Sequence, residues 1–169
     1  MQVLTKISQF TGEYEFLSNF YPCNGFRGPT LEHEFQAAKF KDVTIVTEIL
    51  AAAKPSEAKK IARKPEYKEK IRPGWEMSRV FVMHRLLVVK FSPTANKQLA
   101  KKLVLTKDTL LEEGNYWKDD FWGVYPPGSN NGFNMLGKLL MDVREQLIRN
   151  SAYVDYARKL ANTKPIEQV

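Results

Sequence analysis

The sequence predicts a mainly α-helical protein with a small β element near its N-terminus, an α+β class formed by one domain. From Thr30 onward, apolar residues recur at helical spacing, whereas residues 1–29 carry aromatics and glycines at turn-like intervals. A length of 169 residues is typical of a single domain, and 43% apolar content is enough to form a buried core. We expect residues 1–150 to form this domain and residues 151–169 to form a helical or flexible C-terminal extension.

The β element is predicted from aromatic and glycine residues that lack helical spacing. Such residues are typical of short strands joined by turns. They are Phe10, Gly12, Tyr14, Phe16, Phe20, Tyr21, Gly25, Phe26 and Gly28.

Helices are predicted in order along the rest of the chain. Thr30 is a suitable cap for the first helix, apolar spacing over residues 43–53 predicts a second, and Pro55 suits the first turn of a third. Residues 75–91 are apolar around most of a helix circumference, which predicts a buried helix. This helix contains His84, which we expect to be packed and hydrogen-bonded.

The C-terminal part combines two helices with an irregular segment. Ser92 and Pro93 predict the end of the buried helix and the start of another one, which carries Leu99 and Leu103. Residues 106–133 show no regular period, and Asn134 is a suitable cap for the last strong helix.

Composition excludes several classes of protein. No run of about 18 apolar residues is present, so we expect no membrane span, and the N-terminus lacks the pattern of a secretory signal. Cys23 is the only cysteine, so neither an internal disulfide nor a zinc cluster is expected. The sequence therefore predicts a soluble cytoplasmic protein that needs no metal and no organic cofactor.

The net charge is +7, from 26 basic and 19 acidic residues. Eight of the basic residues lie between Lys54 and Arg72. This segment has two interpretations, a solvated helix face with a loop or a patch that binds phosphate or a polyanion, and charge alone does not choose between them.

The stretch PTLEHEFQAAKF, residues 29–40, concentrates polar residues on one predicted helix. At about 100° per residue, Glu32, Gln36 and Lys39 form a row beside the apolar stripe of the helix. A row at this border is either a surface contact near a helix terminus or one wall of a polar pocket. His33 lies on the opposite side of Glu32 from the apolar stripe, and we do not expect it to be catalytic.

Several blocks of the chain, in order from about residue 10 to residue 148, resemble the NADAR, or YbiA-like, superfamily. The blocks are FLSNFYP (16–22), PTLEHEFQAAKF (29–40), PSEAKKIAR (55–63), Trp75, MHRLLVVKF (83–91), LLEE (110–113), DDFWG (119–123) and NMLGKLLMDVREQL (134–147). The resemblance implies a compact helical YbiA-like fold and N-glycosidase activity. Members of this superfamily hydrolyse phosphorylated intermediates of early riboflavin biosynthesis, which releases ribose 5-phosphate, and others remove ADP-ribose from guanine, including guanine in DNA.

The resemblance also implies site residues. Carried over by motif, they are Asn19, Glu32, Trp75, Asp120 with Asp119 as its rival, Trp122 and Asn134. The chain departs from the family pattern after Gly123, where Val124 to Ser129 replace an acidic or glycine-rich turn, and at Thr106-Lys107. Both departures lie near the expected substrate, so they put its identity in doubt more than the reaction type.

The chemistry of the reaction assigns roles to the charged candidates. Cleavage of a ribosyl C–N bond passes through an oxocarbenium-like state, which a fixed carboxylate beside C1 stabilises, and we expect Glu32 to be that carboxylate and to orient or deprotonate water. Lys39 would keep Glu32 ionised or hold a phosphate. Asp120 is the candidate acid for the leaving nitrogen, by an analogy with O-glycosidases that is only partial.

The remaining candidates would bind the substrate. Trp75 and Trp122 are either core residues or faces on which a base stacks. Asn19 and Asn134 either bond ribose hydroxyls or stabilise turns and caps, and Asn134 could also leave helix N–H groups free for phosphate. Gly137 is costly in a helix, which indicates close approach of backbone to a neighbour or ligand. Phe20, Gln36 and Gly123 complete the expected set.

Three functions agree with these observations. The first is an N-glycosidase of small phosphorylated ribosylamines, the second is a hydrolase that removes ADP-ribose from guanine and contacts DNA, and the third is a non-catalytic binder of nucleotides or nucleic acid. The basic segment mildly favours the second function.

Overall fold

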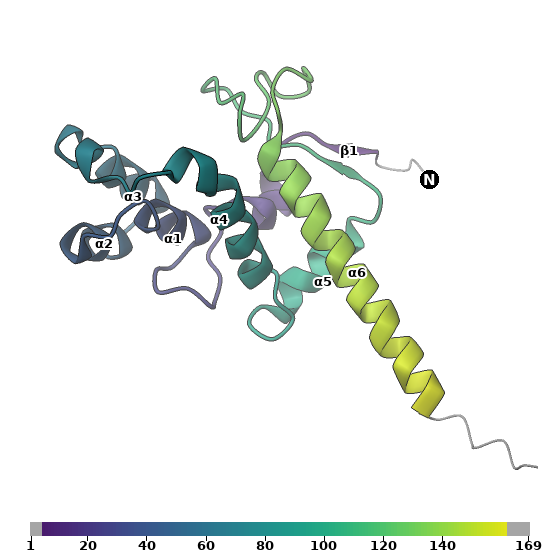
Figure 1. Cartoon of the computed structure of the whole chain (residues 1–169). Helices are drawn as coiled ribbons and strands as arrows, with labels where there is room; N and C mark the ends of the chain where they lie inside the picture. The colour runs from purple at the N-terminus through teal and green to yellow at the C-terminus, as the bar shows by residue number, and fades with distance from the viewer. Residues whose placement is uncertain (1–4, 162–169) are drawn as a thin grey trace, which may run out of the picture.

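The computed structural model describes residues 5–161 of the chain and confirms the predicted class, mainly α-helical with a small β element (Figure 1). The elements, in chain order, are β1 (Lys6–Ile7), the 3-10 helix η1 (Gly12–Leu17), α1 (Leu31–Ala37), α2 (Val43–Leu50), α3 (Pro55–Ala62), the 3-10 helix η2 (Pro65–Lys70), α4 (Trp75–Lys90), α5 (Lys97–Leu105), β2 (Leu110–Leu111) and α6 (Met135–Ala161).

The helices form two packed groups that meet at α4. The first group is α1, α2 and α3, which pack against one another, and α1 also packs against α4. In the second group α6 packs against α4 and α5. One apolar cluster lies under α1, α4, α5 and α6, and a smaller one lies between α1, α2 and α3. The wall of α1 that faces α3 and α4 is therefore placed where the two groups join.

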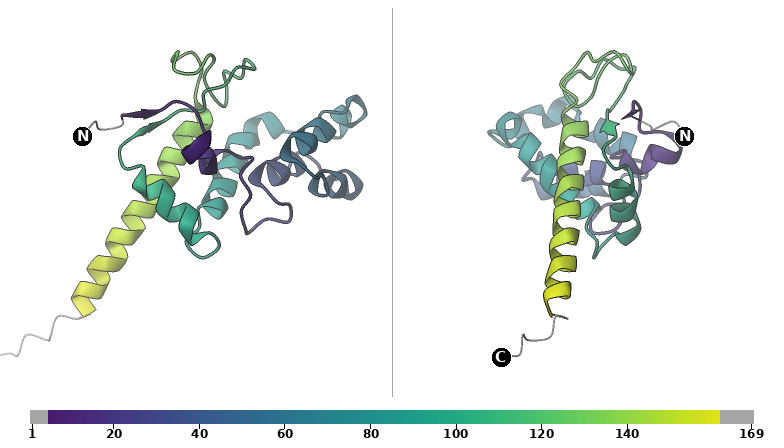
Figure 2. Two further views of the ribbon diagram at one scale, coloured as in Figure 1. Left: turned by 180° about the vertical axis from the view of Figure 1, so that it is seen from behind. Right: turned by 90° about the vertical axis from the view of Figure 1, so that its right-hand side faces the viewer.

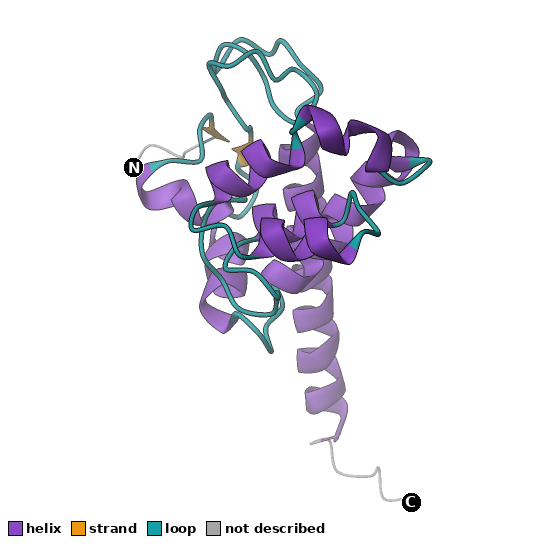
Figure 3. Cartoon of the chain, turned by 90° about the vertical axis from the view of Figure 1, so that its left-hand side faces the viewer, coloured by secondary structure: helices purple, strands orange, loops and turns teal. Residues whose placement is uncertain are grey.

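The β element is smaller than the sequence suggested. β1 and β2 pair in parallel, with Lys6 opposite Leu110 and Ile7 opposite Leu111. Within the region expected to hold short strands and turns, residues 12–17 instead form the helix η1, which buries Phe16 and Leu17 in the main core. The pairing of β1 with β2 fixes the start of the loop that runs from residue 112 to α6, which Figure 3 shows at one end of the molecule.

Two of the predicted helix starts are confirmed. The Thr30 hydroxyl accepts a hydrogen bond from the backbone N–H of His33 at 3.4 Å, and Pro55 occupies the first turn of α3. His33 itself is fully buried, with Nδ1 at 2.8 Å from the Thr30 hydroxyl and Nε2 at 3.1 Å from the carbonyl of Ala52. His33 thus joins α1 to the end of α2.

The prediction of a fully buried helix at residues 75–91 is wrong. The inner face of α4 buries Trp75, Met83 and Leu87, but Met77 and Phe81 are 91% and 64% exposed. The count of apolar residues exceeds what one side of the core accommodates, so the outer face of α4 stays apolar and exposed. His84 lies between these faces, and its Nε2 is 2.8 Å from the Asp142 carboxylate on α6, which confirms the predicted hydrogen bond.

α6 continues past residue 150 as one helix to Ala161, beyond the rest of the fold (Figure 2). The predicted division at residue 150 stays a prediction, and residues 162–169 of the expected extension lie outside the described residues. Among residues 5–161, no helix combines the length and the hydropathy that a membrane span requires.

Candidate active site

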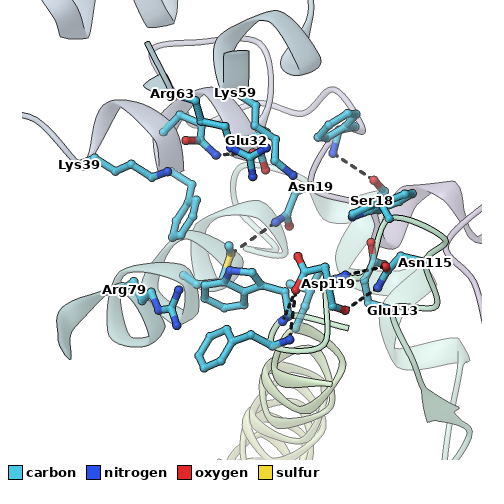
Figure 4. A pocket seen from close by; sticks show the side chains of 18 of the residues that line it. Ser18, Asn19, Glu32, Lys39, Lys59, Arg63, Arg79, Glu113, Asn115 and Asp119 are labelled. Atoms are coloured by element: carbon cyan, nitrogen blue, oxygen red, sulfur yellow. Dashed lines mark hydrogen bonds between the residues drawn. The ribbon is translucent and has the colours of Figure 1, made fainter. Parts of the chain in front are cut away.

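A cavity of about 350 Å³ opens where α1, α3, α4 and the loop after β2 meet. Figure 4 shows Glu32, Lys59 and Arg63 on one side and Glu113, Asn115 and Asp119 on the other, with Asn19 between them. The lining residues are Ser18, Asn19, Phe20, Glu32, Phe35, Gln36, Lys39, Lys59, Arg63, Trp75, Glu76, Arg79, Met83, Glu113, Asn115, Trp117, Asp119, Phe121, Trp122 and Leu136.

Glu32 and Gln36 form the α1 wall of the cavity. Their exposed fractions are 5% and 3%, and the Gln36 side-chain amide donates to the Glu32 carboxylate at 2.6 Å. The row predicted on the helix therefore belongs to a pocket wall and not to a solvated surface. Because the Gln36 NH2 group is engaged by the carboxylate, its oxygen Oε1 points elsewhere, and this buried atom has no hydrogen-bond partner within residues 5–161.

Cationic side chains from three helices surround the same cavity. Lys39 follows α1, Lys59 and Arg63 come from α3 and its end, and Arg79 comes from α4. Burial lowers the pKa of Lys39 to about 8, although the nearby Glu32 carboxylate opposes this shift. The Arg79 guanidinium lies 3.8 Å from the centre of the Phe121 ring, which holds it flat against the cavity wall.

The basic segment from Lys54 to Arg72 divides into two kinds of residue. Lys64 pairs with Glu48 and Lys70 pairs with Asp42, so these cations stabilise contacts of α2. Lys59 and Arg63 instead face the cavity. The segment therefore supplies both structural ion pairs and cations that line the cavity, and binding of phosphate or a polyanion by it stays a prediction.

Two indole rings belong to the cavity and to the core at once. Trp75 is 6% exposed, and its ring lies 5.2 Å from that of Phe35, centre to centre. Phe35 also meets Trp122 edge to face at 5.5 Å. Phe35 thus fixes both indoles beside Glu32, where a planar base could stack on either of them.

The wall opposite α1 carries a carboxylic acid that the sequence did not single out. Glu113 follows β2, and burial together with the nearby Asp119 carboxylate raises its pKa to about 7. Its neighbour Glu112 faces away, pairing with Lys6 at 2.7 Å and accepting from the N–H of Gly128 at 3.1 Å. In the sequence, Glu113 was marked only as part of the LLEE block. Neighbouring residues of an extended segment point to opposite sides, so Glu113 faces the cavity while Glu112 does not.

Asp119 lines the cavity, whereas Asp120 does not. The Asp119 carboxylate accepts hydrogen bonds from the backbone N–H groups of Phe121 at 3.2 Å and Trp122 at 2.9 Å. The Asp120 side chain is exposed, and its backbone carbonyl accepts from the N–H of Phe133 at 2.7 Å. Of the two acids proposed from the sequence, only Asp119 is brought to the site.

The predicted binding residues also divide into two groups. Asn19, Phe20, Gln36, Trp75 and Trp122 line the cavity, together with Glu32 and Lys39. Gly123, Asn134 and Gly137 lie outside it and contact the backbone that leads to Glu113. Asn134 precedes α6, but its side chain bonds to this backbone instead of capping the helix.

The described part of the chain offers no cluster of three or more His, Cys, Asp or Glu side chains that could hold a metal ion.

Residues 7–148 match the NADAR domain family. This chain belongs to that family. The match covers the cavity described above and agrees with the resemblance seen in the motifs.

Two relatives carry names that agree with the predicted enzyme class. An N-glycosidase of Nostoc punctiforme is 40% identical over 145 residues, 81% of this chain and 87% of that protein. A riboflavin biosynthesis protein of Vibrio vulnificus is 40% identical over 82% of this chain, and the chain spans only 37% of the length of that protein.

The fold resembles a solved structure of the same family. The NMR structure of the Escherichia coli protein YbiA superposes with a TM-score of 0.68 at 29% identity and covers 99% of this chain and 100% of that one. In sequence comparison the E. coli protein, named N-glycosidase YbiA, is 36% identical over 139 residues.

Proposed function

We propose that the protein is an N-glycosidase that hydrolyses the bond between ribose C1 and a nitrogen. The observation that carries the proposal is the buried Glu32 carboxylate, which faces a cavity bordered by Trp75 and Trp122. Relatives that are named N-glycosidases and match most of this chain support the same reaction.

Glu32 would act on the charge that develops as the C–N bond breaks. Positive charge appears at C1 and the ring oxygen only in the transition state, so a fixed carboxylate there lowers the barrier rather than merely binding substrate. The hydrogen bond from Gln36 at 2.6 Å fixes the position of the carboxylate, and 5% exposure keeps water from screening it. The carboxylate then orients the attacking water and takes its proton.

Unpaired acceptors in the cavity suit a ribose. The side-chain oxygens Oδ1 of Asn19 and Oε1 of Gln36 are buried without a hydrogen-bond partner within residues 5–161. Asn19 donates its NH2 group to the sulfur of Met83 at 3.6 Å, and because that sulfur has no proton to give, the amide oxygen is the atom directed away from it. Sugar hydroxyls would supply the donors that these oxygens lack.

The cations of the cavity suit a phosphorylated substrate. Lys39, Lys59 and Arg63 lie on the side of Glu32, where the 5-phosphate of a ribose would be within their reach. The substrate we favour is therefore a phosphorylated ribosylamine intermediate of riboflavin biosynthesis, whose hydrolysis releases ribose 5-phosphate. The name of the Vibrio vulnificus relative supports this choice of pathway.

One observation favours a second substrate, guanine that carries ADP-ribose. A neighbouring hollow of about 450 Å³ is lined by Lys60, Lys64 and Ser56 and shares Phe20, Lys59 and Arg63 with the main cavity. A substrate that continues beyond its first phosphate could extend into this basic hollow.

A parallel assay distinguishes these substrates. The protein is incubated with the phosphorylated ribosylamino-pyrimidine of riboflavin biosynthesis, with its dephosphorylated form and with an oligonucleotide carrying ADP-ribosyl-guanine. We expect release of ribose 5-phosphate from the first compound at the highest kcat/KM. Release of ADP-ribose alone would select the second substrate, and no release from any of them would contradict the N-glycosidase.

Loss of the Arg63 cation is expected to weaken phosphate binding specifically. Arg63→Ala should raise KM for the phosphorylated substrate by about tenfold or more, as expected for loss of a charge-assisted hydrogen bond. KM for the dephosphorylated form should stay within about twofold, because that form lacks the group which Arg63 contacts. Lys68→Ala removes an exposed cation of the same segment outside the cavity and serves as control. Equal effects of both substitutions would indicate a general charge effect instead.

A further inference from the structure

A departing nitrogen needs a proton, and the acids predicted from the sequence are badly placed to give one. Asp120 is exposed and outside the cavity. Asp119 lies in the cavity, but its Oδ1 already accepts hydrogen bonds from two backbone N–H groups, so this oxygen is engaged by the loop. The cavity therefore requires another acid if the leaving group is protonated.

Glu113 meets the geometric requirement. It lines the cavity on the wall opposite Glu32, and Figure 4 shows its carboxyl group among the labelled cavity residues. Its Oε2 atom is shielded from solvent and has no hydrogen-bond partner within residues 5–161. A carboxyl group that lines a polar cavity and has a shielded, unpaired oxygen is arranged to carry a proton.

Burial and two neighbouring carboxylates favour the protonated form of Glu113. Burial raises its pKa to about 7, Asp119 and Glu32 act in the same direction, and Lys59 and Lys90 oppose them. Lys90 is itself fully buried on α4, with its ammonium nitrogen 2.5 Å from the Ser18 carbonyl, and burial lowers its pKa to about 7. Its opposing effect is therefore weakest above neutral pH, where it loses its proton.

Three residues outside the cavity hold the backbone of Glu113. The Asn134 side chain accepts from the Glu113 N–H at 3.0 Å and donates to the Leu111 carbonyl at 2.8 Å. A Cβ at Gly123 would lie 2.0 Å from the Glu113 carbonyl oxygen, and one at Gly137 would lie 2.2 Å from the Leu111 carbonyl oxygen. Only glycines allow these approaches, so residues 123, 134 and 137 converge on one short segment.

We infer that Glu113 is the general acid of the reaction and that Asn134, Gly123 and Gly137 are positioning residues for it, an inference that rests on the proposed function. The C1–N bond breaks with its electron pair on the nitrogen, which takes the Glu113 proton and leaves as a neutral amine. Water adds to C1 and gives a proton to Glu32. Exchange with solvent then returns a proton to Glu113 and removes one from Glu32.

The pH dependence of Glu113→Gln tests the inference. For the wild type, kcat/KM should fall as pH rises through about 7, because only the protonated acid is active. Glu113→Gln should lower kcat by about 100-fold at pH 6 and abolish that fall. With nitrophenyl ribofuranoside 5-phosphate, whose leaving group departs without a proton, the variant should keep nearly wild-type activity, which also shows that its site is folded.

Two matched variants make the result decisive. Glu112→Gln alters the adjacent carboxylate, which pairs with Lys6 outside the cavity, and should preserve the alkaline fall. If Asp120→Asn removes that fall and Glu113→Gln does not, the assignment to Glu113 is wrong although the proposed function stands. If the wild type releases no ribose 5-phosphate and no ADP-ribose, the proposed function fails and the assignment fails with it.

The positioning role has its own readout. Asn134→Ala removes both hydrogen bonds to the Leu111–Glu113 segment, so the Glu113 carboxyl should become more exposed to water. We expect kcat to fall about tenfold with little change in KM, and the midpoint of the alkaline fall to move to lower pH. A loss of thermal stability with unchanged kcat and midpoint would show that Asn134 is only structural.

Discussion

Replacement of Glu32 by glutamine is expected to lower kcat by about 1,000-fold while the protein stays folded. This is the size of effect expected when an enzyme loses one group that stabilises charge in the transition state. Glutamine has nearly the same shape, and its carbonyl oxygen can still accept the hydrogen bond from Gln36. What disappears is the negative charge beside C1. KM should change little, because that charge acts only when the bond breaks.

Glu34→Gln is the matched control for this result. Glu34 lies on the same helix and is 7% exposed, close to the 5% of Glu32. Its carboxylate accepts from the Arg27 backbone N–H at 2.6 Å, bonds the Arg27 guanidinium and does not line the cavity. We expect lower thermal stability and nearly unchanged kcat for Glu34→Gln. If both variants lost activity equally, buried charge on α1 would be a structural requirement and the role of Glu32 would be lost.

Two helix starts and the polar row of α1 followed from local features of the sequence, whereas the sequence left open whether that row lies on a surface or in a pocket. Thr30 and Pro55 mark helix starts through their own hydrogen bonding and fixed φ, so no tertiary information is needed. The row of Glu32, Gln36 and Lys39 follows from helical spacing alone, and its burial reflects the place of α1 between α3 and α4.

Family motifs named Asn19, Trp75 and Trp122, but other cavity residues could not be predicted because they come from distant elements. Arg63 ends α3, Arg79 lies on α4 and Glu113 follows β2, so no spacing along the chain relates them. The burial of α4 was overestimated for a related reason. The apolar residues of a helix show how many side chains could be buried, but the area of the core that faces the helix decides how many are buried. Met77 lies outside that area and stays exposed.

Some residues of the family motifs lie outside the cavity, against the backbone behind it. Family resemblance marked Asn134, and a glycine at position 137 of a helix had two possible explanations, close approach to a neighbour or to a ligand. The structure places both residues against the Leu111 carbonyl, so the close approach at Gly137 is to a neighbouring backbone. A residue that recurs in a site motif can therefore act on the backbone behind the site.

Alanine at Gly137 is expected to destabilise the protein by about 3 kcal/mol, at the upper end of the usual cost of overpacking. Helix propensity alone predicts the opposite sign, because alanine in a helix interior is favoured over glycine by about 1 kcal/mol. The difference arises from the neighbours of the new methyl group, which would lie 2.2 Å from the Leu111 carbonyl oxygen and 2.5 Å from Oδ1 of Asn134. Neither the strand backbone nor the bonded amide can move without breaking its own hydrogen bonds.

Urea unfolding of Gly137→Ala and Gly12→Ala separates packing from backbone strain. Gly12 has φ of +58° and open space around its Cβ position, so alanine there should cost only about 1 kcal/mol through strain. Gly137 lies within α6 and has no such strain, so its cost would come from the clash alone. A Gly137→Ala protein as stable as the wild type would mean that α6 can move away from β2. Glu113 would then not be held by close packing, and the positioning role of Gly137 would have to be abandoned.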